Sequence, residues 1–321
     1  MSRYSEFDPD QLDVRPFAEI QHTVHSDKFA SVPRSNASFA DFWASLPRIH
    51  AGETVRTVAS RIAQAKQKER GIIAACGAHV VKCGLAPVLI SLMREGFLTT
   101  LAVNGATAIH DIEIALFGST SEVVAEGLTQ GSFGMARETA EFMNFAFAEA
   151  VEKKEGAGES LGRALNERGA PNNHLSLLAA AYSMGIPVTV HVAVGTDVVH
   201  MHRSAHGGAM GETSLRDFRI LTSAMRSLTD GGVLLNIGSA VLLPEVLLKC
   251  MACLRNSSPD FTRFLGVNMD MIQQYRANEQ VVTRVKAIGG EGLTLIGHHE
   301  IMVPLLAFAV MEEWHTLTGP A

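Results

Sequence analysis

The apolar positions divide this chain into short apolar runs separated by longer amphipathic stretches, in a regular pattern that begins near residue 54. Apolar residues that recur at three and four positions predict helices, whereas short runs rich in Val, Ile and Leu predict strands. Helices are expected at residues 54–70, 84–96, 110–117, 134–151, 161–168, 174–184, 215–228, 244–255 and 300–314. Strands are expected at residues 71–76, 98–103, 187–194, 232–237, 264–268 and 293–296.

Strands that alternate with helices in this way are typical of α/β domains. We therefore predict a Rossmann-like, doubly wound, mostly parallel sheet with helices on both faces, formed by residues 51–321 as a single domain. Residues 1–50 mix Asp, Ser, Pro and His with scattered aromatic residues. We interpret them as an extended N-terminal arm with one short helix, docked on the domain or on a neighbouring subunit.

Ligands of open parallel sheets bind beyond the carboxyl ends of the strands, so the turns that follow the strands are the candidate binding regions. The most informative turn is residues 104–107 (Asn-Gly-Ala-Thr), which leads into a helix that carries His110, Asp111 and Glu113. Small residues let a ligand approach the backbone, and the free N–H groups of a helix start favour anionic groups. Three ionisable side chains beside such a turn indicate a working site.

A second small-residue turn has the same setting. Residues 238–240 (Gly-Ser-Ala), like Asn104, Gly105 and Ala106, link an apolar strand to a helix, which is the geometry that holds the pyrophosphate of a dinucleotide. Neither turn contains the G-x-G-x-x-G pattern. The alternative interpretation is tight packing of strand against helix, which also requires small residues.

Histidines are concentrated in residues 191–206. His200 and His202 are two positions apart, so on an extended chain they share a face and could bind a metal together with His206 or Asp197. The alternative is a polar loop whose histidines form hydrogen bonds or lie in solvent. The glycine-rich residues 207–212 that follow are expected to be mobile.

Three further residues have a structural interpretation beside a chemical one. Glu245 and Glu300 each stand in the first turn of a predicted helix, where an acidic side chain complements the helix dipole. Lys286 could form a Schiff base if it were desolvated, or it could be an ordinary solvated lysine.

The composition limits the classes of function. A net charge of −6 and a pI near 6.1 argue against nucleic-acid binding, because no excess of cations is available to neutralise phosphates. The polar N-terminal residues show neither a signal peptide nor a membrane-spanning segment. Cys250 and Cys253 have C-x-x-C spacing inside a predicted helix, where packing explains them better than redox chemistry. These features favour a cytoplasmic protein.

Taken in order, several segments resemble the deoxyhypusine synthase family over roughly residues 70–315. The resemblance lies in the helix at 84–96 with the strand after it, in residues 160–166 (Ser-Leu-Gly-Arg-Ala-Leu-Asn), in residues 185–188 (Gly-Ile-Pro-Val), and in residues 238–245. The strand that ends at Asn268 and residues 302–306 also correspond. Members of this family are homotetramers that bind NAD, oxidise spermidine and transfer its aminobutyl group through an imine on a lysine.

The resemblance implies where ligands would bind. NAD would contact Gly77, Gly84, Asn104, Gly105, Ala106, Gly238, Ser239, Ala240, Asn268 and His298. A cationic amine would lie near the acidic side chains Glu113, Asp197, Glu245 and Glu300, with His110, Asp111, His200 and Lys286 as catalytic residues. The sequence departs from the family at the lysine, since the family position falls on Val285, one residue before Lys286.

The sequence therefore predicts an NAD-dependent, homo-oligomeric enzyme of the deoxyhypusine synthase type. Its expected substrate is a polyamine or related cationic amine, which it oxidises. The same enzyme could also transfer an aminobutyl group to an acceptor amine or a protein lysine. Two alternatives remain open. One is a metal-dependent hydrolase that uses His200, His202 and His206. The other is a non-catalytic ligand-binding homologue that has lost the imine-forming lysine.

Overall fold

The computed structural model describes residues 2–319, which form two compact units. The first unit, residues 2–53, contains short 3₁₀ helices at Pro9–Gln11, Phe17–Glu19 and Ser26–Lys28, and the helix α1 (Phe39–Ser45). Ser38 and Asp41 cap α1 reciprocally: the Ser38 hydroxyl accepts the Asp41 N–H at 3.1 Å, and Asp41 accepts the Ser38 N–H at 2.9 Å. The predicted short helix is present, and docking of the arm stays a prediction.

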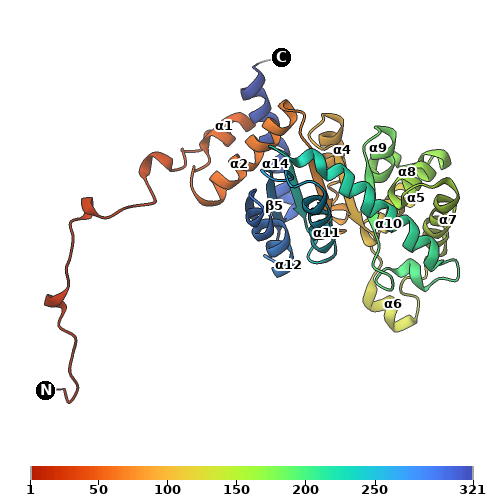
Figure 1. The fold of residues 1–321 in the computed structure, drawn as a ribbon, viewed down its shortest axis with the longest axis horizontal. Helices are drawn as coiled ribbons and strands as arrows, with labels where there is room; N and C mark the ends of the chain where they lie inside the picture. Colours follow the sequence, from red (N-terminus) through yellow and green to blue (C-terminus); the bar gives the residue numbers. More distant parts are fainter. Residues whose placement is uncertain (1, 320–321) are drawn as a thin grey trace. The chain divides into compact units, whose positions relative to one another are not determined.

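The second unit, residues 54–319, contains a six-stranded, all-parallel sheet with the order β3-β2-β1-β4-β5-β6 (Figure 1). The strands are β1 (Ile72–Cys76), β2 (Thr100–Asn104), β3 (Val188–His191), β4 (Val233–Ile237), β5 (Leu265–Asp270) and β6 (Glu291–Ile296). The chain leaves β1 toward β2 and β3, then crosses to β4 and continues in the opposite direction. This order is that of a doubly wound Rossmann-like sheet, and it confirms the predicted fold class.

The register aligns the carboxyl ends of the central strands. Cys76 at the end of β1 pairs with Val103 of β2 on one side and with Ile237 of β4 on the other. All five residues of β1 are fully buried, because helices cover both faces of the sheet. The turns at Gly77, Asn104 and Gly238 consequently begin at the same edge.

One face of the sheet is covered by α10 (Gly207–Ala224), α11 (Leu242–Ser257) and the helical segment 275–287. Their apolar side chains form one buried cluster with sheet residues such as Ile73 and Leu234. The segment consists of α12 (Tyr275–Ala277), a π-helical stretch (Asn278–Thr283) and α13 (Arg284–Ala287). It returns the chain from the carboxyl end of β5 to the amino end of β6.

The other face is covered by α2 (His50–Gln67), α4 (Ala86–Arg94) and α14 (His299–Thr318). Ile62, Leu89 and Val303 from these helices surround the β4 side chains Leu235 and Ile237. The chain turns from β1 into α4 through the short helix α3 (His79–Lys82). Since α14 follows β6 yet packs near α3 and α4, its first residues lie close to the turn after β1.

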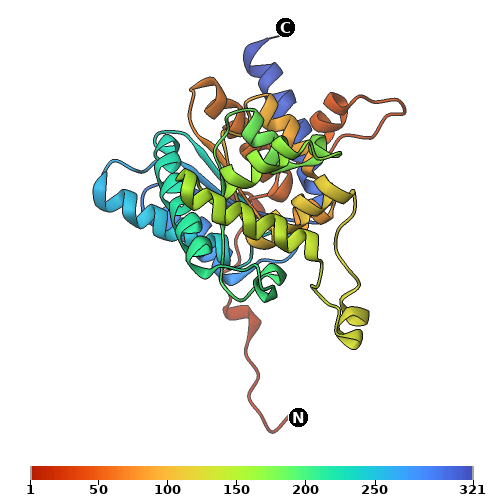
Figure 2. The same cartoon turned by 90° about the vertical axis from the view of Figure 1, so that its right-hand side faces the viewer.

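The connection from β2 to β3 is the longest and contains five helices. These are α5 (Gly105–Phe117), α6 (Val124–Gln130), α7 (Arg137–Lys153), α8 (Ala157–Arg168) and α9 (Leu177–Ser183). In Figure 1 they gather on the side of the sheet away from β5, and Figure 2 turns α7 toward the viewer. This helical group supplies one wall of the candidate site described below.

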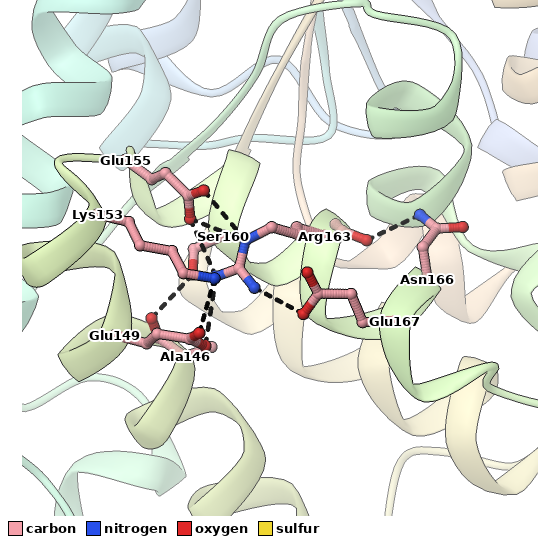
Figure 3. A network of polar contacts seen from close by, with 9 residues as sticks. Ala146, Glu149, Lys153, Glu155, Ser160, Arg163, Asn166 and Glu167 are labelled. Atoms are coloured by element: carbon pink, nitrogen blue, oxygen red, sulfur yellow. Dashed lines mark hydrogen bonds and ion pairs between the residues drawn. The ribbon is translucent and has the colours of Figure 1, made fainter.

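An arginine on α8 stabilises this helical group. The Arg163 side chain is 7% exposed and is surrounded by the carboxylates of Glu149, Glu155 and Glu167, at 3.3, 3.0 and 2.7 Å (Figure 3). Its Nε also donates to both oxygens of Glu155, at 3.0 and 3.1 Å, so the fork of the guanidinium is used bidentately. Because Glu149 lies on α7, the arginine joins α7 to α8.

Two predicted loops are helical in the structure. Residues 207–212, expected to be mobile, form the first turns of α10, because the His206 ring accepts the Ala209 N–H at 3.0 Å and caps the helix. Residues 275–287, which lie between the expected strands 264–268 and 293–296 and where no helix is expected, form the helical segment. In the part of the chain that the structure describes, no helix is both long and apolar enough to span a membrane.

Candidate functional site

Two glycines meet at the point where the strand order reverses between β1 and β4. A Cβ on Gly77 would lie 2.2 Å from the carbonyl oxygen of Gly238, so only glycine fits there. Gly238 has a φ of +68°, and a Cβ on it would lie 2.8 Å from the His299 ring. The two turns thus pack directly against each other at the topological switch point, beside the crevice that open α/β sheets have outside the carboxyl ends of their strands. In open α/β sheets this crevice is the place where nucleotides bind.

A buried histidine beside the two glycine turns also fits the binding of a dinucleotide. His299 is fully buried in the crevice, and its Nδ1 has no hydrogen-bond partner among the described residues. Its Nε2 lies 3.4 Å from the Met269 carbonyl oxygen and 3.8 Å from Asp270 Oδ1. A buried ring nitrogen without a partner is costly, and a polar ligand in the crevice would satisfy it.

The helix start at Asn104 differs from this crevice. Asn104 caps α5 by accepting the Thr107 N–H at 2.9 Å. Directly beside Gly105 lies the carboxylate of Asp197, so close that a Cβ on Gly105 would be 2.0 Å from Asp197 Oδ2. A carboxylate at this position repels phosphates. The geometry therefore does not support the predicted dinucleotide contacts of Asn104, Gly105 and Ala106.

Instead, the first turns of α5 line a pocket of about 200 Å³, which we call the α5 pocket. Its walls come from α3, α5, residues 121–133 and residues 196–198. The polar and ionisable lining residues are Lys82, His110, Glu113, Ser121, Glu122, Thr196 and Asp197, and the apolar ones are Ala106, Ile109, Val124, Phe133 and Val198. Three carboxylates, one histidine and one lysine thus converge on a small space.

A hydrogen-bond chain fixes the state of His110. Thr120 donates its hydroxyl proton to Glu113 Oε2, so it accepts the proton of His110 Nδ1 at 2.6 Å. The neutral His110 ring consequently has its lone pair on Nε2. Burial alone would raise the pKa of Glu113, but the hydrogen bonds from His110 and Thr120 outweigh burial and hold that pKa below its usual value. Glu113 is therefore an anion that orients His110.

Asp197 and His200 form a second pair at the pocket. The His200 Nδ1 accepts the N–H groups of Gly195 and Asp197, at 3.1 and 3.2 Å, so the ring proton resides on Nε2, 3.8 Å from Asp197 Oδ2. Asp197 Oδ2 is buried and has no hydrogen-bond partner among the described residues. Burial raises the pKa of the Asp197 carboxyl, an effect that His200 partly offsets.

Two predicted acidic site residues, Asp111 and Glu245, lie elsewhere. Asp111 is 1% exposed and caps α9, accepting the Leu177 and Leu178 N–H groups at 2.7 and 3.1 Å. Glu245 on α11 is paired with Lys249 and, at 3.3 Å, with Arg276. Neither carboxylate faces the α5 pocket, so the expected contacts with an amine are not supported.

Lys286 also lies away from the α5 pocket. It is exposed on α13, which ends just before the amino end of β6, so it lies at the sheet edge opposite the site. The adjacent Val285 is fully buried in the core. The structure therefore places Lys286 away from the candidate site, and its role as the imine-forming lysine stays a prediction.

The remaining predicted cofactor residues differ in burial and in their hydrogen-bond partners. Gly84 lies in an exposed turn with a φ of +71° between α3 and α4. Ser239 is buried and its hydroxyl accepts the Leu243 N–H at 3.3 Å, while Ala240 is half-buried beside it. Asn268 lies buried within β5 and accepts a 2.8 Å hydrogen bond from Asn236. His298 stands at the N-cap position of α14 without a capping hydrogen bond from its side chain, which is 67% exposed.

The predicted histidine metal site is not assembled. Residues 198–201 form a 3₁₀ turn instead of an extended strand, so His200 and His202 do not share a face. The His202 Nε2 hydrogen-bonds the Gly134 carbonyl oxygen at 2.8 Å, and His206 caps α10. Each ring thus has a separate partner.

Sequence reasoning missed the lysine of the α5 pocket. Lys82 stands at the end of α3, and α3 packs against α5, which brings Lys82 to the same pocket as His110. Its position directly after the first strand was the available signal, because that turn always lies at the carboxyl edge. His79, Cys83 and His299 are further polar residues of this edge.

The fold and site define a Rossmann-like α/β protein with a switch-point crevice and a separate charged pocket. Residues 56–139 match the family model of the arginine dihydrolase ArgZ-like C-terminal domain, described as a Rossmann fold. An ornithine cyclodeaminase of Methanothermobacter thermautotrophicus is 37% identical over 67 residues, which are 21% of this chain and 16% of that protein. The family match includes Gly77, Lys82, His110 and Glu113, whereas Asp197 lies outside it.

Two solved structures share the arrangement of elements. The ternary complex of AgrE with ornithine and NAD+ is 14% identical, with a TM-score of 0.50, over 86% of this chain and 35% of AgrE. An Entamoeba histolytica protein assigned as a deoxyhypusine synthase is 11% identical, with a TM-score of 0.51, over 85% of this chain and 93% of that one. At such identities the likeness shows the fold alone. The resemblance to deoxyhypusine synthases therefore holds for the fold.

Proposed function

We propose that this protein is an NAD-dependent enzyme that acts on a small diamino acid of the ornithine type. The observation that carries the proposal is the buried Oδ2 of Asp197 at the wall of the α5 pocket, which has no hydrogen-bond partner among the described residues and lies 3.8 Å from His200 Nε2. A buried carboxylate oxygen without a partner is unfavourable, and a substrate ammonium would supply the missing hydrogen bond. The matched family and the ornithine found in AgrE support the same class of ligand.

The charges of the pocket favour an amino acid over a polyamine. Glu113, Glu122 and Asp197 can pair with ammonium groups, but Lys82 in the same pocket cannot. A diamine or polyamine would bring a further positive charge toward this lysine. A diamino acid instead offers its α-carboxylate to Lys82 and its two ammonium groups to the carboxylates.

The size of the pocket agrees with this class of ligand. A volume of about 200 Å³ is smaller than the pockets of drug-sized ligands, so it suits a small amine and excludes a dinucleotide. The dinucleotide would instead bind at the switch point between β1 and β4, beside the buried His299, whose Nδ1 has no hydrogen-bond partner among the described residues. Bound NAD supplies a hydride acceptor.

The residues of the chain prepare the substrate for oxidation. Asp197 and Lys82 would hold the charged groups of the amino acid and fix its orientation. His110 Nε2, which carries the lone pair of the neutral ring because Nδ1 donates to Thr120, would accept a proton from the substrate ammonium. The resulting free amine has a lone pair that stabilises positive charge at the neighbouring carbon. Glu113 stabilises the His110 imidazolium that forms.

The alternatives have less support. Aminobutyl transfer requires a lysine at the site in the position of Lys286, which lies at the opposite sheet edge. A hydrolase built on His200, His202 and His206 requires a shared metal, and these rings have separate partners. A non-catalytic binding protein remains a distinct outcome of the experiment below.

The experiment is a ligand screen of the full chain by thermal shift and calorimetry, with NAD, L-ornithine, putrescine and spermidine alone and in pairs. We expect stabilisation by NAD, tighter binding of ornithine than of putrescine or spermidine, and formation of NADH absorbance with ornithine. Binding of spermidine in preference to ornithine would contradict the substrate class. Ornithine binding with neither NADH formation nor consumption of ornithine would indicate the non-catalytic alternative.

A further inference from the structure

A second cluster of polar side chains lies beside the crevice and outside the α5 pocket. His79, Cys83 and Glu300 each offer one ligand atom, and these three atoms lie within 4.8 Å of one another. The Cys83 Sγ lies 3.7 Å from Glu300 Oε2. We propose that His79, Cys83 and Glu300 form a binding site for a divalent transition metal, of which Zn²⁺ is the best match.

The backbone places the first two ligands together. Cys83 follows His79 by four residues, and the Cys83 N–H donates to the His79 carbonyl oxygen at 2.9 Å, so one helical turn separates them. Residues at this spacing share a helix face, as do the paired histidines of helical zinc sites. Glu300 arrives from the first turn of α14. The site therefore joins the turn after β1 to the helix after β6.

The donor set selects the metal. An imidazole nitrogen, a thiolate and a carboxylate oxygen are the three ligand types that Zn²⁺ binds, whereas Mg²⁺ and Ca²⁺ require oxygen ligands. Around a tetrahedral zinc, with metal–ligand distances of about 2.0–2.3 Å, the donor atoms lie roughly 3.5 Å apart. The three atoms are thus close to that spacing before any metal binds.

Three protein ligands leave one coordination position open. His298 Nδ1 lies 3.8 Å from Glu300 Oε1, so this ring can either orient the carboxylate or take the fourth position. Coordination replaces the proton on Cys83 Sγ, which passes to solvent. His79, Cys83 and Glu300 are not among the residues that line the α5 pocket, so the metal site does not depend on the proposed activity.

The test is Co²⁺ and Zn²⁺ binding to the full chain, without NAD or substrate. Co²⁺ reports a thiolate ligand through a charge-transfer absorption band in the near ultraviolet. We expect one equivalent of metal, loss of this band in Cys83→Ser, and binding weakened about tenfold or more in His79→Ala and Glu300→Gln. Zn²⁺ should also raise the thermal stability of the wild-type chain and leave that of Cys83→Ser unchanged.

Cys253→Ser is the matched control, because Cys253 is an exposed cysteine on α11 away from the site. It should bind metal as the wild type does. The proposal is overturned if the wild-type chain binds no metal, if the cobalt band persists in Cys83→Ser, or if His79→Ala and Glu300→Gln bind as tightly as the wild type.

Discussion

The Asp197 carboxylate occupies the space in which residue 105 would have its Cβ, so that the absence of a side chain at Gly105 positions the acid of the α5 pocket. The missing Cβ would lie 2.0 Å from Asp197 Oδ2 and 2.8 Å from its Cγ. Glycine at this helix start therefore serves a carboxylate of the same chain, and the pocket depends on it. An added methyl group must displace Asp197 or the start of α5.

Gly105→Ala should disturb the pocket more than the fold. We expect weaker ornithine binding and a loss of about 1–3 kcal/mol in unfolding free energy, because overpacking of a buried contact costs about this much. Calorimetry and chemical denaturation measure the two effects. Gly211→Ala on α10, where a Cβ meets no atom within 4 Å, should leave ornithine binding unchanged and raise the unfolding free energy slightly, because alanine favours the helix. Unaltered ornithine binding in Gly105→Ala would contradict the role of this contact.

Lys82→Met should reduce affinity for ornithine about tenfold while leaving putrescine binding unchanged or tighter, because only ornithine has a carboxylate for Lys82. The comparison of the two ligands separates loss of this charge pair from general damage to the pocket. Lys286→Met should leave both affinities as they are, since Lys286 lies at the opposite sheet edge. Equal losses for ornithine and putrescine would argue against the assigned contact.

Arg163→Met should lower the unfolding free energy by about 1–2 kcal/mol, because it removes the shared cation of three carboxylates of which only Glu155 is largely buried. The unfolding free energy of Arg163→Lys should lie between those of the wild type and Arg163→Met, because an ammonium group cannot reproduce the bidentate contact with Glu155. Urea denaturation of the wild type and the two variants measures the order of their stabilities. A lysine variant as stable as the wild type would show that charge alone suffices.

Asp217 should make stability dependent on pH. Burial raises its pKa to about 7, although it accepts the Val190 and Gly158 N–H groups. Because the folded state holds this proton more tightly than the unfolded state, the stabilising contribution is complete below pH 3.8 and is lost as the pH rises toward 7. Asp217→Asn keeps an accepting oxygen and does not titrate.

The stability of Asp217→Asn relative to the wild type should therefore increase between pH 4 and pH 8, as urea denaturation at each pH would measure. Asp111, whose pKa burial raises to about 6, titrates in part of the same range and should leave a residual slope in this variant. If the difference between the two proteins were independent of pH, Asp217 would not be the titrating group.

The sequence was sufficient for the fold because the apolar periodicity changes clearly between strands and helices from residue 54 onward. It also indicated the correct edge of the sheet, since ligand sites follow the carboxyl ends of parallel strands. His110 and Glu113 follow from that argument, Asp197 follows from the histidine-rich segment and the family resemblance, and the structure brings all three to one pocket.

The sequence could not decide which way neighbouring side chains point. His110 and Asp111 are adjacent on α5, and successive side chains of a helix point in different directions. His110 therefore faces the pocket, whereas Asp111 caps α9. Similarly, the assumption of an extended chain at residues 198–201 placed His200 and His202 on one face, whereas the 3₁₀ turn separates them.

Contacts between residues that are far apart in the sequence could not be predicted either. The helical segment 275–287 reverses direction after β5, which places Lys286 at the amino edge of the sheet. The pairing of Asp197 with Gly105, and of His79 and Cys83 with Glu300, joins residues that are far apart in sequence. Periodicity contains no information about such contacts.

The central claim is that Asp197 holds an ammonium group of a diamino acid in the α5 pocket. Its most direct measurement is the calorimetric affinity of the NAD-saturated chain for L-ornithine in the wild type, in Asp197→Asn and in Glu245→Gln, whose carboxylate is already paired with Lys249 and Arg276. We expect affinity to fall roughly 30-fold or more in Asp197→Asn, which corresponds to about 2 kcal/mol, and to stay unchanged in Glu245→Gln. Wild-type affinity in Asp197→Asn would contradict the account.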